Sequence, residues 1–416
     1  MAQIDTLTLE DALRFSGPAS FNLLIKPAGS RCNLLCRYCY YLDKLELYGG
    51  REPVMDEEDL ERLIRTYLRD CATPDVTFNW HGGEPLLLGP GFFRKAVELQ
   101  RRYADGKRVH NTLQTNGTLL TPEWADFFAR EGFLLGVSVD GPSCVHDRYR
   151  KDRKGVSTLE KTLKGLTLLH EAGAEYNLLA TVNRASEGRG KEVYRFLRSL
   201  GTPFIQFSPV VELIRKGPGG ERIAAPGSSD AVRAPWSVSD TGFGRFLCDV
   251  FDDWVLSDVG TVFVNYFDAT LACLCGVRPG ICSFAETCGG NAAVEHNGDV
   301  YSCDHFVYPE FLLGNLYRQP LADMMQSPAQ MAFGLKKREG LPKACRSCEW
   351  FGRCHGGCPK HRLYGAGNVL CEGYRLYFRH TAPYMEKMKE LLEAGQAPSG
   401  IMPWARLRVR DARNGR

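Results

Sequence analysis

Three cysteines stand close together near the amino terminus, in the stretch "CNLLCRYC". Cys32, Cys36 and Cys39 have the spacing C-x3-C-x2-C. Three thiolates on one loop can hold three irons of a [4Fe–4S] cube and leave the fourth iron open for an outside ligand. The competing interpretations are a zinc site, for which the next candidate ligands, His81 and Cys71, lie far along the sequence, and three unrelated buried thiols. The tight spacing favours the cluster.

A second group of cysteines follows residue 272. In a chain whose amino terminus shows no export signal, clustered cysteines are expected to be metal ligands rather than disulfides. A pair of zinc sites is one interpretation of this group, because "CRSC" followed by a later pair resembles a zinc ribbon. Eight cysteines of this group fall in two runs, Cys282, Cys288 and Cys303, then Cys345, Cys348, Cys354, Cys358 and Cys371. The other five, interpreted as buried or incidental thiols, are Cys71, Cys144, Cys248, Cys273 and Cys275.

One carboxylate stands next to a cysteine of this second group. Asp304 directly follows Cys303 in "GDVYSCDHF". If Cys303 is a cluster ligand, the backbone carries the carboxylate close to the cluster, where it could accept a proton from a substrate thiol or hydroxyl. The alternative is an aspartate that caps a turn at the end of a hairpin.

The elements that position these residues follow from short apolar runs that alternate with amphipathic stretches. Strands of this kind, alternating with helices, predict repeated βα units around a parallel sheet. Six units make a partial, TIM-like (β/α)6 barrel, in which chemistry gathers at the carboxyl ends of the strands. The predicted strands are 22–27, 76–80, 111–116, 134–140, 176–183 and 204–209, and the predicted helices between them are 56–70, 91–104, 122–131, 157–172 and 189–200.

The pattern changes after the sixth strand. Residues 215–235 are rich in Gly, Pro and Ser and predict a flexible insertion, and two helices are expected near 241–256 and 264–275. Residues 276–373 show little regular periodicity and would need metal centres to hold them, and the tail after about 395 is expected to be mobile. The expected division is 1–20 extension, 21–211 barrel, 212–240 insertion, 241–275 helical linker, 276–380 cysteine-rich domain, and 381–416 helix and tail.

Composition limits the function classes. The chain has 416 residues and a formal net charge of +3 from 52 basic and 49 acidic side chains, which argues against nucleic acid as the main partner. The start "MAQIDTLTLEDALRF" lacks the basic and apolar regions of a signal peptide. The sequence contains no run of about 18 apolar residues, so no membrane span is expected. We therefore expect a cytoplasmic protein in a reducing compartment.

The first cysteine motif, with the aromatic Tyr38 before its last cysteine, resembles the radical S-adenosylmethionine (AdoMet) superfamily. The resemblance implies that the open iron binds the methionine end of AdoMet, whose cleavage releases a 5′-deoxyadenosyl radical. "HGGEP" (81–85), "SVDGP" (138–142) and "DRYRKD" (147–152) stand where the superfamily contacts its cofactor. The implied AdoMet-binding residues are Tyr38, Gly82, Gly83, Glu84, Ser138, Asp140, Arg150 and Val211.

The second group of cysteines resembles the SPASM extension of radical enzymes that modify peptides. The resemblance implies two fully ligated auxiliary [4Fe–4S] clusters, three clusters in all, with electron transfer as the role of the auxiliary pair. The first set of ligands would be Cys282, Cys288, Cys303 and Cys358. The second set would be Cys345, Cys348, Cys354 and Cys371.

A closer resemblance covers residues 21 to 380. "LLIKPAGSRCNLLCRYCYYL", "LQTNGTLL", "CDHFVYPEFLLGNL" and "CRSCEWFGRCHGGCPKHR" are similar to anaerobic sulfatase-maturating enzymes. Those enzymes oxidise a cysteine or serine in a sulfatase C/S-x-P-x-R motif to Cα-formylglycine. The resemblance implies that Asp304 is the base and that Tyr41 positions the substrate, with packing as the alternative role for Tyr41. Family members usually carry Gln before "GGEP", where this chain has His81.

The resemblance also implies partners: a sulfatase polypeptide as substrate, an electron donor such as a flavodoxin or ferredoxin, and no nucleic acid or membrane, with the enzyme acting as a monomer. Two other functions are alternatives. A maturase that forms a thioether or carbon–carbon crosslink in a ribosomally made peptide would use the same clusters. A non-catalytic iron–sulfur electron carrier would leave the glycine-rich cofactor elements without a purpose.

Overall fold

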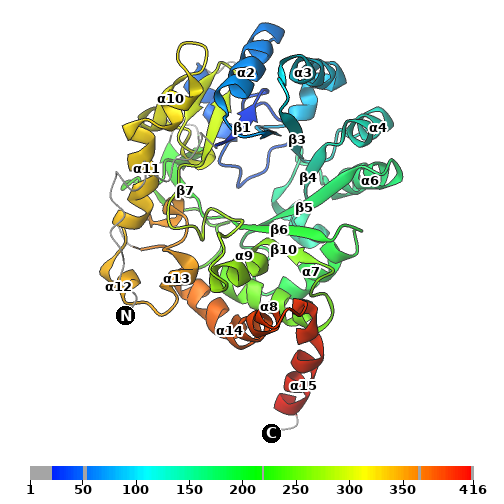
Figure 1. The fold of residues 1–416 in the computed structure, drawn as a ribbon, viewed down its shortest axis with the longest axis vertical. Coiled ribbons are helices and arrows are strands. Elements are labelled where there is room, and N and C mark those ends of the chain that lie inside the picture. Colours follow the sequence, from blue (N-terminus) through cyan, green and yellow to red (C-terminus); the bar gives the residue numbers. More distant parts are fainter. Residues whose placement is uncertain (1–20, 50–53, 218–219, 364–366, 414–416) are drawn as a thin grey trace.

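Six parallel strands in chain order form the centre of the molecule, which is described here from a computed structural model covering residues 21–49, 54–217, 220–363 and 367–413. Each predicted strand is present, and the strands pair in the order β1-β2-β3-β4-β5-β6. Figure 1 shows the helices on the outside of this curved sheet. The predicted partial barrel is therefore confirmed. The strands are β1 (Asn22–Lys26), β2 (Asp75–Trp80), β3 (Arg108–Thr115), β4 (Leu134–Ser138), β5 (Glu175–Val182) and β6 (Phe204–Pro209).

The helices of the barrel lie near their predicted positions. Their apolar faces pack against the outer face of the sheet. Alternate strand residues, such as Tyr176, Leu178 and Ala180 of β5, are therefore buried. The short helix α5 was not predicted. The helices are α2 (Glu57–Asp70), α3 (Gly89–Tyr103), α4 (Pro122–Glu131), α5 (Ser143–Tyr149), α6 (Leu159–Glu171) and α7 (Gly190–Arg198).

The cysteine-rich segment adds strands to the same sheet, which the sequence analysis did not predict. β11 (Asn291–Glu295) pairs in parallel with β1, so that Lys26 lies opposite Glu295. β12 (Asp299–Tyr301) and β13 (Leu312–Asn315) extend the edge in antiparallel pairs. Strands of three to five residues are too short to show a period of two, and here they are stabilised by pairing of β11 with β1 and of β12 and β13 with the strand before each. The consequence is that residues 303 and 304 follow the strand β12 at this edge.

The insertion at 212–240 is also ordered into strands. β7 (Leu213–Gly217), β8 (Gly220–Ala224) and β9 (Val232–Arg233) form an antiparallel sheet in the order β8-β7-β9. The sequence predicted a flexible insertion here and no strands, and the described part of it contains these three strands. Pro226 and Gly227 lie in the turn between β8 and β9, and Pro235 lies in a turn after β9.

The carboxyl-terminal part is mainly helical. The predicted helices after the insertion are present as α8 (Gly242–Ser257) and α9 (Asn265–Leu274), and the two-residue strand β10 (Phe263–Val264) pairs with β6. Instead of a mobile tail, the chain forms a helix that packs on the body through Ile401 and Ala405, both 0% exposed. The remaining helices are α10 (Leu321–Met325), α11 (Pro328–Glu339), α12 (Lys343–Arg346), α13 (Phe351–Cys354), α14 (Cys371–Glu393) and α15 (Ile401–Arg413).

None of the helices in the described ranges is long and apolar enough to cross a membrane.

Candidate active site at the carboxyl ends of the strands

The loop that follows β1 carries the first three cysteines. The backbone N–H of Leu34 donates to Cys32 Sγ at 3.4 Å, and that of Cys39 donates to the carbonyl of Cys36 at 3.0 Å. All sixteen cysteines of the chain are unpaired thiols. Burial raises the pKa of Cys32 and of Cys36 to about 12, so a nearby cation is needed to hold these thiols as thiolates. Iron supplies such a charge, and the site fits an iron cluster in this respect.

Gly82 and Gly83 pack against this loop. The Gly83 N–H donates to the Gly29 carbonyl at 2.8 Å, and a Cβ on Gly83 would collide with the carbonyl of Arg31. Gly82 has φ +122°, a conformation that favours glycine. The sequence analysis explained these glycines by close approach to a ligand, whereas the contact that the structure shows is close approach to the cysteine loop.

The carboxylate of Glu84 is fully buried and engaged within the protein. It accepts hydrogen bonds from Leu86 N–H at 3.1 Å, Thr115 Oγ1 at 2.8 Å and Asn116 N–H at 2.8 Å. Burial raises its pKa to about 7, although these donors oppose the shift. Glu84 therefore ties the loop after β2 to the end of β3. Asn116 also donates to Asn33 in the cysteine loop at 2.9 Å, and the sequence analysis assigned it no role.

Three of the predicted cofactor residues form one buried cluster. The Tyr38 hydroxyl donates to Asp140, whose other oxygen accepts from Arg150 Nε at 3.0 Å and from the Thr181 N–H at 3.1 Å. Arg150 also lies 5.5 Å from the centre of the Tyr38 ring. The Asp140 carboxylate thus holds Arg150 and Tyr38 in place.

The other two predicted cofactor residues lie apart from this hydrogen-bonded cluster. The Ser138 hydroxyl accepts from Gln114 Nε2 at 3.1 Å, on the neighbouring strand. Val211 is 1% exposed and packs in the main hydrophobic core.

Asp304 is held between two side chains from the other end of the chain. Its Oδ1 forms an ion pair with Lys26 Nζ at the end of β1, and its Oδ2 accepts from the hydroxyl of Tyr40. Although burial raises its pKa, the Lys26 ammonium holds the pKa of Asp304 well below its usual range, so the carboxylate is ionised. A turn-capping aspartate would instead accept from backbone N–H groups, and in the described chain its partners are side chains.

Tyr41, predicted to position the substrate, has a different neighbour from Tyr40. Its hydroxyl donates to Glu295 on β11, and the ammonium of Lys26 lies 3.4 Å from the centre of its ring. Its side chain is 3% exposed. These contacts favour the packing role for Tyr41. Tyr40 is the tyrosine that contacts Asp304. The only indication of this role in the sequence is the pair of adjacent tyrosines after Cys39.

His81 stands beside the same carboxylate with a fixed tautomer. The Gly82 N–H donates to His81 Nδ1 at 2.8 Å, so the ring proton resides on Nε2. Burial lowers the pKa of His81 to about 4, although the charge of Asp304 opposes the shift, so the ring is neutral near pH 7. His81 therefore offers one oriented N–H donor close to Asp304.

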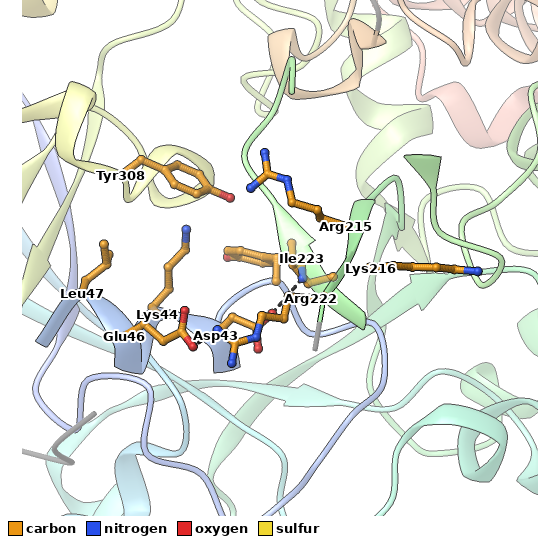
Figure 2. Close-up of a pocket in the computed structure, with 11 residues that line it drawn as sticks. Asp43, Lys44, Glu46, Leu47, Arg215, Lys216, Arg222, Ile223 and Tyr308 are labelled. Carbon is orange, nitrogen blue, oxygen red and sulfur yellow. Dashed lines mark hydrogen bonds and ion pairs between the residues drawn. The ribbon is translucent and has the colours of Figure 1, made fainter. Parts of the chain in front are cut away.

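A pocket of about 290 Å³ lies next to this site (Figure 2). Tyr40 forms part of its wall and also contacts Asp304. The Lys44 ammonium points toward Tyr308 and lies 3.1 Å from the centre of its ring. Burial, with Lys26 and Lys360 nearby, lowers the pKa of Lys44 to about 7. The other lining residues are Asp43, Glu46, Leu47, Arg215, Lys216, Gly217, Arg222 and Ile223, several of them from the β7–β8 hairpin.

The eight later cysteines lie in two groups that match the implied sets. Cys303 lies close enough to Cys282 and Cys358 for their charges to interact, as does Cys288. In the described part of the chain, no three Cys, His, Asp or Glu side chains converge as ligands of a single metal ion would. A cube is bound through separate irons instead. The second group forms in the same way, with Cys354 facing Cys345, Cys348 and Cys371.

Comparisons with known proteins agree with this arrangement. Residues 27–197 match the Radical SAM superfamily, and residues 282–349 match SPASM, an iron–sulfur cluster-binding domain. A cysteine loop at the end of β1 in a partial barrel, followed by a cysteine-rich domain, defines a radical AdoMet enzyme with auxiliary clusters. Its cofactors are [4Fe–4S] clusters and AdoMet.

Full-length relatives narrow the class to one family. The chain is 45% identical to a serine-type anaerobic sulfatase-maturating enzyme of Bacteroides thetaiotaomicron, over 91% of this chain and 94% of that protein. It is 30% identical to a cysteine-type enzyme of Clostridium perfringens, over 87% of this chain and 96% of that protein. A solved structure of native anSMEcpe with bound AdoMet and Cp18Cys peptide superimposes with a TM-score of 0.79 at 29% identity, over 89% of this chain and 99% of that one. The chain belongs to the anaerobic sulfatase-maturating enzymes.

Proposed function

We propose that this chain oxidises a cysteine or serine in a sulfatase C/S-x-P-x-R motif to Cα-formylglycine, with Asp304 as the base. The observation that carries the proposal is the Asp304 carboxylate, held ionised by Lys26 and Tyr40 beside the pocket that opens at Tyr40. A peptide that enters this pocket would bring its side chain toward the carboxylate.

The proposed ligands are Cys32, Cys36 and Cys39 for the radical cluster and the two later groups for the auxiliary clusters. When bound, the radical cluster and AdoMet supply the 5′-deoxyadenosyl radical that removes a hydrogen atom from the substrate Cβ, and the auxiliary clusters accept one electron. The AdoMet contacts are proposed at the residues named from the resemblance. The carboxylates of Glu84 and Asp140 already accept hydrogen bonds from groups within the protein. We therefore propose that Glu84 contacts AdoMet through its backbone and that Asp140 orients Arg150 and Tyr38.

Asp304 takes the proton from the substrate hydroxyl or thiol. Loss of one hydrogen atom, one proton and one electron converts serine to the aldehyde directly. The same loss converts cysteine to a thioaldehyde, which water hydrolyses to the aldehyde with release of sulfide. The Lys26 ammonium keeps Asp304 ionised, so its carboxylate is in the form that can accept this proton.

The expected partners are a sulfatase polypeptide and a flavodoxin or ferredoxin, with the enzyme acting as a cytoplasmic monomer. Anaerobic incubation of the reconstituted enzyme with C-x-P-x-R and S-x-P-x-R peptides, read by mass spectrometry, tests the activity. Formylglycine from the cysteine peptide loses sulfur, whereas a crosslink would lose hydrogen only and would favour the peptide maturase. Formation of 5′-deoxyadenosine without any change in peptide mass would contradict both.

Cys32, Cys36 and Cys39 provide the control. A variant with all three changed to Ala should form no 5′-deoxyadenosine, since the open iron is lost. Cleavage of AdoMet by this variant would contradict the radical mechanism.

A further inference from the structure

Lys337 is a buried lysine next to the loop that begins at Cys282, the first cysteine of the first auxiliary set. It lies on α11 and is 0% exposed. Its Nζ donates to the carbonyls of Cys282 at 2.8 Å and Ser283 at 3.0 Å, and to that of Ala285. Three carbonyl acceptors require three N–H groups, which only the ammonium form has. Lys337 is therefore a buried cation attached to the loop that begins at Cys282.

A buried ammonium needs a negative partner, because removal of a charge from water is costly. Lys337 forms no ion pair with a carboxylate in the described part of the chain. Its charge interacts with three cysteines of the first set, Cys282, Cys288 and Cys358, and with the like charge of Arg362. As thiolates around a cluster, they would supply the negative charge that this site otherwise lacks.

Arg362 is a second cation that is close to cysteines of both sets. Its Nη2 donates to the carbonyl of Lys337 at 2.6 Å. Its charge interacts with Cys288 and Cys358 of the first set and also with Cys345 and Cys354 of the second. A Cβ on Gly356 would lie 3.1 Å from Arg362 Nη2, so the guanidinium is closely packed there. A second cation thus lies near cysteines of both proposed clusters.

We infer that Lys337 is a positioning residue that fixes the Cys282 loop and raises the reduction potential of the first auxiliary cluster. A reduced cluster carries one more negative charge than the oxidised one, so a fixed cation beside it stabilises the reduced form. The electron that leaves the substrate would then be accepted at the cluster adjacent to Asp304, and Arg362 would ease its passage to the second. The inference rests on the proposed ligand sets and not on the identity of the peptide.

A redox titration followed by electron paramagnetic resonance tests this. It is done in the full-length chain with Cys32, Cys36 and Cys39 changed to Ala, so that only the auxiliary clusters contribute. Lys337→Met should shift the potential of the first auxiliary cluster to more negative values. Lys336→Met is the matched control, because Lys336 is the adjacent exposed lysine on the same helix and should leave the potential unchanged.

An unchanged potential in Lys337→Met, or an equal shift in Lys336→Met, would overturn the inference. If Lys337→Met fails to retain the first cluster, Lys337→Arg decides the matter by iron content and potential. Restoration of both by the arginine supports the role of the charge, and failure to restore them refutes it. None of these measurements uses a substrate, so they stand apart from the test of peptide oxidation.

Discussion

At the scale of single residues, the site depends on a carboxylate that three parts of the chain hold together. Asp304 comes from the cysteine-rich domain, Lys26 from the end of β1, and Tyr40 from the loop after the radical-cluster cysteines. The position of Asp304 next to a cysteine was visible in the sequence. Its partners were not, because a contact over 264 residues leaves no local pattern. A lysine at the end of a buried strand was the one available signal for Lys26.

Asp304→Asn should separate radical formation from oxidation. The variant keeps the shape of the side chain but removes the base, so AdoMet cleavage should continue while aldehyde formation falls by about a hundredfold or more. Quantification of 5′-deoxyadenosine and of peptide aldehyde in the same reaction measures both. A normal yield of aldehyde would return Asp304 to a structural role.

His81 should influence the choice between serine and cysteine. Its Nε2–H is an oriented donor, and a hydroxyl oxygen accepts a hydrogen bond better than a thiol sulfur does. His81→Asn keeps an acceptor for the Gly82 N–H but removes the distal donor. We expect kcat/KM for the S-x-P-x-R peptide to fall about tenfold more than that for the C-x-P-x-R peptide.

His81→Gln, which keeps a distal N–H, should retain more activity on the S-x-P-x-R peptide than His81→Asn. The exposed His110, changed to Gln, serves as the control. Equal losses on both peptides in His81→Asn would show that His81 acts on packing alone.

At the scale of elements, the sequence predicted those strands and helices that carry their own pattern. The six barrel strands and their helices are long enough for apolar periodicity to identify them. The β7–β9 sheet and the β11–β13 strands were missed because most of them are short and are stabilised by pairing partners elsewhere in the chain. The candidate site was predicted unevenly. Cysteine spacing and the family resemblance predicted the cluster ligands, whereas the roles of Tyr40, Thr115 and Asn116 emerged only from the fold.

The contact between α8 and α14 gives a prediction at this scale. A Cβ on Gly244 would collide with the backbone of Gly373, two residues after Cys371 at the start of α14. Gly244→Ala should therefore push α14 outward, destabilise the protein by about 1–3 kcal/mol and weaken retention of the second auxiliary cluster.

Thermal unfolding and iron content check both effects of Gly244→Ala. Gly91→Ala in α3 is the control, because a Cβ there meets open space and should leave stability and iron unchanged. An equal effect of the two substitutions would show that the approach of the helices is not the cause.

At the scale of the whole molecule, the two auxiliary sets are interleaved along the chain. Cys358 groups with Cys282, Cys288 and Cys303, although it lies between Cys354 and Cys371 of the other set. The alternating order joins the two halves of the cysteine-rich domain into one unit.

Cys358→Ala should remove the first auxiliary cluster and spare the ligands of the second. Iron content and Mössbauer spectra of the reconstituted variant measure the loss. Cys273→Ala, which changes a cysteine outside both sets, should keep the full complement. Loss of both clusters in Cys358→Ala would place the cysteine in a shared structural role instead.

The parallel pairing of β1 with β11 has a consequence for how such an enzyme can be divided. A fragment that ends before β11 would leave β1 as an open edge strand, with the ammonium of Lys26 deprived of the carboxylate that balances it. Chimeras between relatives would therefore be expected to tolerate an exchange of the β7–β9 sheet more readily than an exchange of the cysteine-rich domain. The barrel with the first cysteine loop and the cysteine-rich domain therefore share one sheet and are expected to fold together.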